Sequence, residues 1–294
     1  MHTAAPYHSS DNCLFQTEKI TDRLTRIRMP GNVFTYYYQS DACGLLIDTG
    51  LGYGSFRAFL EDPENHLAAK QRYAVLLTHG HLDHAGGAGE FDSVHLHPSD
   101  LALALKHSDP ALRARYLQEN GVDHTVSDIE KRLAPPCRKA SFLPEWETGP
   151  DDDLQIIPLP GHTRGSLVIL FKKERILLAG DALNSWTLLF SAPDSPSMED
   201  YHDALCRLSG NFGSQFDRIL YSHPHNAGGP EILEQMITLT SDILSGKNRD
   251  SCAILRLGHP ALLAKPVDPK TLLRKDGEWA NLVYDADNLY TSMR

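Results

Sequence analysis

Three imidazoles and one carboxylate lie within six consecutive positions, in the run His-Gly-His-Leu-Asp-His at residues 79–84. Imidazole and carboxylate groups are the usual ligands of a catalytic zinc or a related first-row metal. The segment before them, residues 73–77, is short and continuously apolar, which predicts a buried strand. We therefore expect the cluster on the loop that leaves the carboxyl end of a core strand, where open α/β sheets place their sites.

The spacing favours two metals over one. His79 and His81 can point to one side of extended or tightly turned backbone, and a turn after Leu82 can aim Asp83 and His84 at a neighbouring point. One metal does not readily use all four groups and keep a position open for substrate, whereas two metals can. The alternative is a polar loop whose histidines cap strand and helix ends. Buried imidazoles and carboxylates need partners, so this alternative explains a cluster poorly.

The pattern His-x-His-x-Asp-His, followed by Ala-Gly-Gly, resembles the signature of the metallo-β-lactamase superfamily, in its glyoxalase-II-like branch. That family's pattern requires four more polar residues, each at the end of an apolar run. This chain has them in order, at Asp48, His162, Asp181 and His223. The resemblance covers about the first three quarters of the chain. It implies an α/β fold, the four-layer αββα sandwich in which two mixed β-sheets are flanked by helices.

The resemblance also implies a binuclear metal site with seven ligands. The first metal would be held by three histidines, the second by two histidines and an aspartate, and one aspartate would bridge both. In that order the ligands are His79, His81 and His162, then Asp83, His84 and His223, and finally Asp181.

Three residues are candidates for a catalytic role beside the metals. Asp83 would act as a ligand, and Asp48 would orient the ligand loop without touching a metal. His225 competes with His223 for the last ligand position, either as the ligand itself or as a neighbour that carries protons. No residue is expected to bind an organic cofactor. The expected cofactors are two divalent metal ions, zinc first, with iron and manganese as alternatives.

These ligands predict a binuclear hydrolase in which a metal-bridging hydroxide attacks a small ester, thioester or lactone. The sequence contains no Gly-x-Ser-x-Gly elbow, Walker loop or Gly-x-Gly-x-x-Gly fingerprint, so the metal cluster has no rival motif. Two other reactions stay open: a mono-iron oxidoreductase resembling persulfide dioxygenases, and a hydrolase of small phosphodiesters. A non-catalytic scaffold would be expected to lose some of the ligands, and here all are present.

Charge and cysteine usage limit the partners and the compartment. The formal net charge is −10, from 28 basic and 38 acidic residues, which gives no electrostatic footprint for nucleic acid or an anionic membrane. The five cysteines are scattered and lack a Cys-x-x-Cys pair, which favours a reducing compartment. No secretory signal and no membrane span is recognised. We expect a cytoplasmic protein with a small-molecule substrate and a homodimer as a candidate assembly.

The chain is expected to form one domain, residues 1–294, with halves at about 1–108 and 151–294 and a helical insertion at about 109–150. The insertion is either a lid over the site or a surface excursion. Helices are predicted at residues 55–61, 99–120 (divided at Pro110) and 230–244. Strands are predicted at residues 24–29, 33–39, 44–48, 73–78, 94–97, 154–159, 166–171, 175–179, 218–222, 252–257 and 281–284.

Five polar or aromatic residues outside the ligand set also have predicted roles. His95 and His97 alternate on a short strand and are predicted to be structural rather than ligands. Asn184, Trp186 and Phe190 follow Asp181, and they either line an apolar pocket or pack against the insertion.

Overall fold

The computed structural model describes residues 14–41, 43–68, 72–137, 140–142, 152–189, 194–256 and 258–291. Phe190, one of the predicted pocket residues, lies outside these ranges. The chain divides into two compact units, Met1–Asp152 and Asp153–Arg294. None of the described helices combines the length and the apolar character that crossing a membrane requires. The four cysteines of the described residues form no disulfide.

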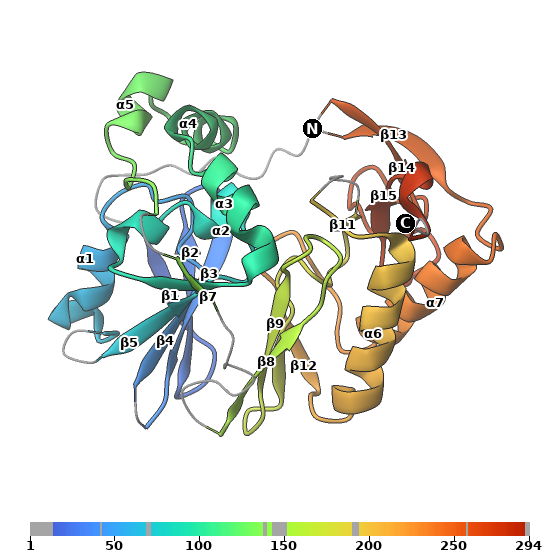
Figure 1. Ribbon diagram of the computed structural model, residues 1–294, viewed down its shortest axis with the longest axis horizontal. Helices are drawn as coiled ribbons and strands as arrows, with labels where there is room; N and C mark the ends of the chain where they lie inside the picture. Colours follow the sequence, from blue (N-terminus) through green and yellow to red (C-terminus); the bar gives the residue numbers. More distant parts are fainter. Residues whose placement is uncertain are drawn as a thin grey trace. The chain divides into compact units, whose positions relative to one another are not determined.

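The N-terminal unit is built on a seven-stranded mixed sheet whose spatial order follows the chain (Figure 1). Its strands are β1 (Gln16–Lys19), β2 (Leu24–Met29), β3 (Val33–Gln39), β4 (Gly44–Ile47), β5 (Tyr73–Leu76), β6 (Val94–Leu96) and β7 (Ala140–Phe142). Strands β1 to β4 pair antiparallel, and β4 to β7 pair parallel. Because β4 and β5 are parallel neighbours, the residues that follow them emerge at the same edge of the sheet.

The hairpin between β2 and β3 turns where the sequence predicts it. Met29 pairs with Val33, and the turn residues Gly31 and Asn32 both have positive φ, +87° and +59°. Glycine suits this turn because the positive φ of Gly31 is strained for a residue with a Cβ, and a Cβ there would also require the end of the Leu51 side chain to shift.

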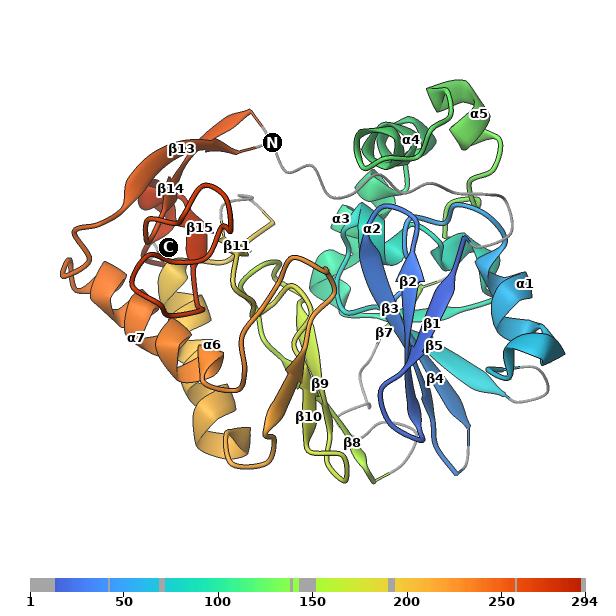
Figure 2. The ribbon, with the colours of Figure 1, turned by 180° about the vertical axis from the view of Figure 1, so that it is seen from behind.

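Five α-helices of the described residues belong to this unit: α1 (Phe56–Glu61), α2 (Leu82–Ala85), α3 (Leu101–His107), α4 (Pro110–Glu119) and α5 (Val126–Glu130). Phe56 and Leu60 of α1 are buried with Leu46 and Val75 of the sheet, and Figure 2 shows α1 beside these strands. Pro110 begins a new helix, as predicted, and the Asp109 carboxylate caps it by accepting from a backbone N–H of its first turn.

Helices α4 and α5 form a second, smaller core with the segment that follows β4. Ala114 and Leu117 of α4 and Ile129 of α5 are buried together with Leu51 and Tyr53. The described part of the predicted insertion is therefore packed onto its own unit through apolar side chains.

The C-terminal unit contains two four-stranded mixed sheets within the described residues. The first has the order β12 (Arg218–Leu220), β10 (Ile176–Leu178), β9 (Leu167–Phe171), β8 (Leu154–Pro158). The second has the order β11 (Thr187–Leu189), β15 (Leu282–Tyr284), β14 (His259–Leu263), β13 (Cys252–Arg256). The last strands of the chain make this additional sheet together with β11.

Three strands of the first sheet point the same way. Strands β10 and β12 are parallel, and β8 and β10 are both antiparallel to β9. The carboxyl ends of β8, β10 and β12 therefore share one edge, and His162, Asp181 and His223 follow them.

Two long helices, α6 (Met198–Phe212) and α7 (Ile232–Leu244), lie side by side and pack on this unit (Figure 1). Tyr201 and Leu205 of α6 and Met236 of α7 are buried in one core with Val168 and Leu177 of the sheet. The helix predicted at residues 230–244 corresponds to α7, whereas no helix was predicted at α6. The missed signal was a capping box in which the Ser197 hydroxyl and the Asp200 carboxylate satisfy each other's backbone N–H groups.

Candidate metal centre

The buried carboxylate of Asp48 organises the polar loop of the N-terminal unit. Asp48 follows β4 with φ of +65°, an uncommon backbone conformation for an aspartate. Its Oδ2 lies 2.8 Å from His84 Nδ1, and its Oδ1 accepts a hydrogen bond from the backbone N–H of Thr78 at 2.7 Å. A carboxylate that is ionised only accepts hydrogen bonds, so His84 Nδ1 carries the hydrogen and the ring lone pair is on Nε2.

A second relay runs from the same carboxylate to His79. The Thr78 hydroxyl donates to Asp48, at 2.8 Å from Oδ2, and it lies 3.1 Å from His79 Nδ1. Because that hydroxyl has one hydrogen and Asp48 takes it, the His79 ring must donate from Nδ1. The lone pair of His79 is therefore also on Nε2, and Asp48 orients both imidazoles.

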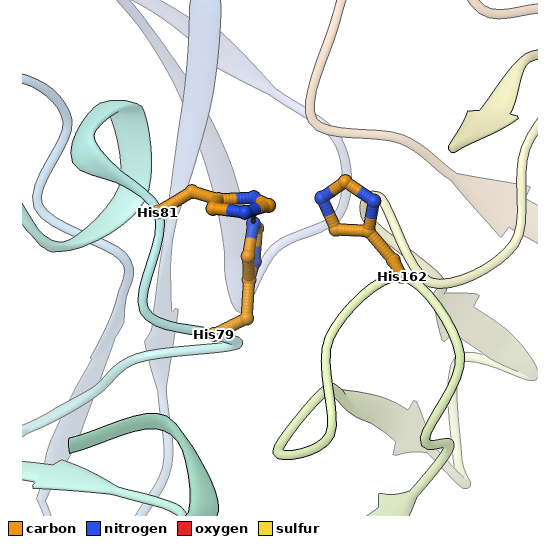
Figure 3. A group of neighbouring side chains, drawn as sticks. All are labelled: His79, His81 and His162. Carbon is orange, nitrogen blue, oxygen red and sulfur yellow. Dashed lines mark hydrogen bonds between the residues drawn. The ribbon is translucent and has the colours of Figure 1, made fainter. Parts of the chain in front are cut away.

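The rings of His79 and His81 meet edge to face, with an interplanar angle of 85° (Figure 3). His79 Nε2 lies 3.0 Å from His81 Nδ1. Two imidazole nitrogens that face one another at this distance are suited to a shared cation, which fits the metal ligand role that the sequence predicts for both.

Gly80 lies between these two histidines in the loop and allows the backbone to approach Asp100 closely. Its N–H donates to the buried carboxylate of Asp100 at 2.9 Å, and a Cβ would lie 2.8 Å from the Asp100 carbonyl. Asp100 occupies the N-cap position of α3, but among the described residues its side chain makes no capping bond to that helix and holds the ligand loop instead.

Two residues of the insertion helix α4 contact the same loop. The hydroxyl of Tyr116 donates to Asp83 Oδ2 at 3.3 Å. The fully buried guanidinium of Arg113 donates to the carbonyls of Gly86 at 2.5 Å, Ala134 at 2.9 Å and Leu51 at 3.3 Å. Burial lowers the pKa of Arg113, although an arginine remains protonated in a protein. Neither residue was predicted from the sequence, because the spacing of residues in α4 does not show which distant groups its side chains contact.

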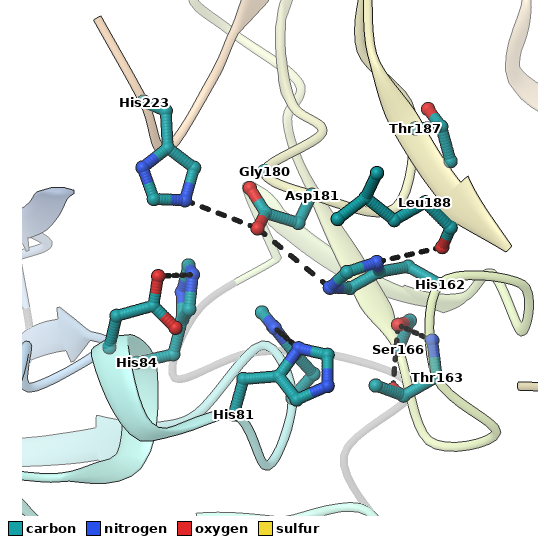
Figure 4. Close-up of polar contacts among 12 residues, drawn as sticks. His81, His84, His162, Thr163, Ser166, Gly180, Asp181, Thr187, Leu188 and His223 are labelled. Atoms are coloured by element: carbon teal, nitrogen blue, oxygen red, sulfur yellow. Dashed lines mark hydrogen bonds and ion pairs between the residues drawn. The ribbon is translucent and has the colours of Figure 1, made fainter. Parts of the chain in front are cut away.

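The three polar residues at the sheet edge of the C-terminal unit also form a group (Figure 4). Asp181 Oδ2 lies 3.2 Å from His223 Nε2 and 3.8 Å from His162 Nε2. His162 Nδ1 lies 3.0 Å from the carbonyl of Leu188. Since a carbonyl only accepts, the ring lone pair is again on Nε2, toward the aspartate.

His225 has a different place from its neighbour. It is exposed and its ring stacks on that of His223 at 5.4 Å between centroids. His223, which directly follows β12, is the histidine that contacts Asp181. The choice between His223 and His225 as a ligand stays a prediction.

Hydrogen bonds within the chain hold three other residues with predicted roles, which are His97, Asn184 and Trp186. His97 Nδ1 accepts the N–H of Ser99 at the start of a short 3₁₀ turn. His95 is half-buried in β6, and this burial lowers the pKa of its imidazole. Asn184 Oδ1 accepts the N–H of Trp186 at 2.7 Å, and the Trp186 indole N–H donates to the carbonyl of Leu272.

A comparison with family models identifies the superfamily of this chain. The model of the metallo-beta-lactamase superfamily matches residues 28–212, more than half of the chain. The chain therefore belongs to the metallo-β-lactamase superfamily, as the sequence motifs indicated. The matched residues include Asp48, the 79–84 cluster, His162 and Asp181, whereas His223 lies beyond them.

Curated relatives match over more than half of the chain. The human acyl-coenzyme A thioesterase MBLAC2 is 30% identical over 177 residues, 56% of this chain and 62% of that protein. The probable metallo-hydrolase YybB of Bacillus subtilis (strain 168) is 29% identical over 197 residues, 65% of this chain and 74% of that protein. The chain thus spans less than two thirds of the thioesterase that it matches.

Solved structures share the fold. The metallo-β-lactamase from Erythrobacter litoralis superimposes with a TM-score of 0.54 at 16% identity, over 78% of this chain and 97% of that chain. The sec-alkylsulfatase Pisa1 from Pseudomonas sp. gives 0.57 at 15% identity, over 80% and 42%. At this identity the likeness shows the fold alone. It confirms the expected α/β sandwich of the metallo-β-lactamase type.

Proposed function

We propose that this chain is a binuclear metal-dependent hydrolase that cleaves thioesters. The single observation that carries the proposal is the orientation of two imidazoles. Asp48 binds Nδ1 of His84, and the carbonyl of Leu188 binds Nδ1 of His162, so the Nε2 atom of each ring is available to a metal. Family membership and the curated thioesterase relatives support the reaction class. Esters and lactones are the neighbouring substrates that share an electrophilic carbonyl.

The proposed ligands are those that the sequence motif implies. One metal would be held by His79, His81 and His162, and the other by Asp83, His84 and His223, with Asp181 as a further ligand. Each group offers donor atoms that zinc, iron and manganese all accept. Within the N-terminal unit, the facing nitrogens of His79 and His81 fit this assignment.

The contribution of the chain is to hold the imidazole rings in the orientation that metal binding requires. Bound divalent metals lower the pKa of water toward neutrality and polarise a carbonyl oxygen. Asp48 and Thr78 hold two imidazoles in the tautomer that a metal requires. The Asp181 carboxylate lies between two imidazole Nε2 atoms and limits the rotation of both rings. In thioester hydrolysis, water adds to the carbonyl carbon, the carbon–sulfur bond breaks, and the products are a carboxylic acid and a thiol.

The test combines metal analysis with a substrate panel. The chain is purified with and without added zinc, its metal content is measured, and it is given acyl-coenzyme A thioesters, aryl esters, lactones, a β-lactam and a phosphodiester. We expect two metals per chain, release of free thiol from thioesters, and loss of more than about 100-fold in kcat/KM for His81→Ala or Asp181→Asn. Two bound metals with no turnover of any carbonyl substrate would contradict the proposal.

The other reactions are outcomes of the same test. One iron per chain with oxygen uptake would favour the mono-iron oxidoreductase, and turnover of the phosphodiester alone would favour the phosphoesterase. His225 stays predicted as a neighbour that carries protons, and the homodimer also stays a prediction.

A further inference from the structure

The insertion helix α4 reaches the ligand loop through two side chains on one face. Arg113 and Tyr116 are three residues apart, so they project from the same side of the helix. Arg113 contacts the backbone that follows the ligand run, at Gly86, and Tyr116 contacts the carboxylate of Asp83. The two contacts lie at opposite ends of the short helix α2.

We propose that Tyr116 is a positioning residue for Asp83. This inference rests on the proposed function, in which Asp83 is a metal ligand. In this inference helix α4 of the insertion fixes the direction in which one carboxylate ligand points. That role differs from the role of a lid over the substrate.

The chemistry of the carboxylate explains how one hydroxyl can do this. Each oxygen of an ionised carboxylate has two lone-pair directions. The Tyr116 hydroxyl, at 3.3 Å, takes one direction of Oδ2, and His84 Nε2 lies 3.8 Å from the same oxygen. Because the hydroxyl occupies one lone-pair direction of Oδ2, rotation of the Asp83 side chain is restricted. The other lone-pair direction of that oxygen is then available to a metal beside Nε2 of His84.

Hydrogen bonds and apolar packing fix the position of helix α4, which carries Tyr116. Arg113 is fully buried and makes hydrogen bonds to three carbonyls. Ala114 and Leu117 pack in the core with Leu51. Charge-assisted hydrogen bonds and apolar packing on the same helix leave little freedom for the residue between them. A phenylalanine at position 116 would keep the ring packing and lose only the hydroxyl.

The experiment compares Tyr116→Phe with Tyr73→Phe. Tyr73 is a matched control, because its hydroxyl also donates to a carboxylate of this unit, that of Glu61 at 2.8 Å, away from the ligand loop. Metal affinity is measured by competition with a chromophoric chelator, and the ligand field by the absorption of the cobalt-substituted protein. We expect Tyr116→Phe to bind the first metal normally, to bind the second about 10-fold more weakly and to shift the cobalt absorption, with Tyr73→Phe unchanged.

Kinetics give a second readout. We expect kcat of Tyr116→Phe to fall while KM stays close to the wild-type value, because the hydroxyl acts on a ligand and does not touch substrate. Equal second-metal affinity and an unchanged cobalt spectrum in Tyr116→Phe and wild type would overturn the inference and leave the proposed function standing. A wild-type chain that binds no second metal would overturn the proposed function itself, and this inference with it.

Discussion

The Oδ2 atom of Asp48 lies 2.8 Å from Nδ1 of His84, while the same carboxylate accepts the hydroxyl of Thr78, which faces His79. One carboxylate thereby determines the tautomers of two imidazoles. In the proposed assignment these two rings belong to different metals, so a single substitution at position 48 is expected to weaken both.

Replacing Asp48 with asparagine tests this dependence. Asparagine tolerates the positive φ of this position, so the backbone is expected to persist, but its amide has one acceptor oxygen where the carboxylate has two. We expect affinity for both metals to fall about 10–100-fold in a chelator competition. Asp41→Asn, which alters an exposed carboxylate paired with Arg23, is the control and should leave affinity unchanged.

The relay through Thr78 can be tested separately. Thr78→Val keeps the side-chain volume but removes the hydroxyl that orients His79, whereas Thr78→Ser retains it. We expect the valine variant to bind the first metal about 10-fold more weakly and the serine variant to resemble the wild type. Equal affinities in the two variants would show that the hydroxyl plays no part in orienting the ring.

Gly161 illustrates how the C-terminal unit places His162. A Cβ at position 161 would overlap the ring of Tyr201, a fully buried residue whose hydroxyl donates to the carbonyl of Ala182. We expect Gly161→Ala to lower the free energy of unfolding by about 1–3 kcal/mol in urea titrations. Gly210 in α6 has open space around it, so Gly210→Ala should instead raise stability by about 0.5–1 kcal/mol.

The half-buried imidazole of His95 predicts a pH dependence of the free energy of unfolding. Burial lowers its pKa from the ordinary value of 6.5, so below that pH the unfolded chain binds more protons at this residue than the folded chain does. The free energy of unfolding should therefore decrease as the pH falls through 6.5, and this loss should stop below the folded-state pKa. Urea titrations above and below pH 6.5 should show a smaller decrease in His95→Gln than in wild type. Substituting the exposed His124 with glutamine should leave the decrease as it is.

Arg113 should be among the residues whose loss costs the N-terminal unit most. Replacement with methionine leaves three backbone carbonyls without their charged donor, and we expect the free energy of unfolding to fall by about 2–4 kcal/mol. Arg115 is an exposed arginine of the same helix, and Arg115→Met should change stability by less than about 0.5 kcal/mol. Similar losses in both variants would count against the role of the buried hydrogen bonds.

The sequence predicted those features that depend on local pattern. Short apolar runs located the strands before Asp48, His79 and Asp181, because a strand buried on both faces reads as a continuous apolar segment. Pro110 located the break between α3 and α4, because proline cannot continue a helix.

What the sequence could not supply depends on contacts between distant segments. The hydrogen bond from Tyr116 to Asp83 joins residues 33 positions apart, and that from Gly80 to Asp100 joins residues 20 apart. No periodicity within either segment encodes such a partner. Helix α6 is a different case: its capping box and its spaced apolar residues were local signals that could have been recognised.

The carboxylate of Asp100 has a practical consequence for anyone who engineers this scaffold. A ranking by N-cap preference would treat position 100 as an interchangeable start for α3 and would accept serine there. Yet this side chain belongs in effect to the loop before it, since it holds the N–H of Gly80. Variants chosen by such a ranking would keep their helical content and lose the alignment of the two histidines on either side of that glycine.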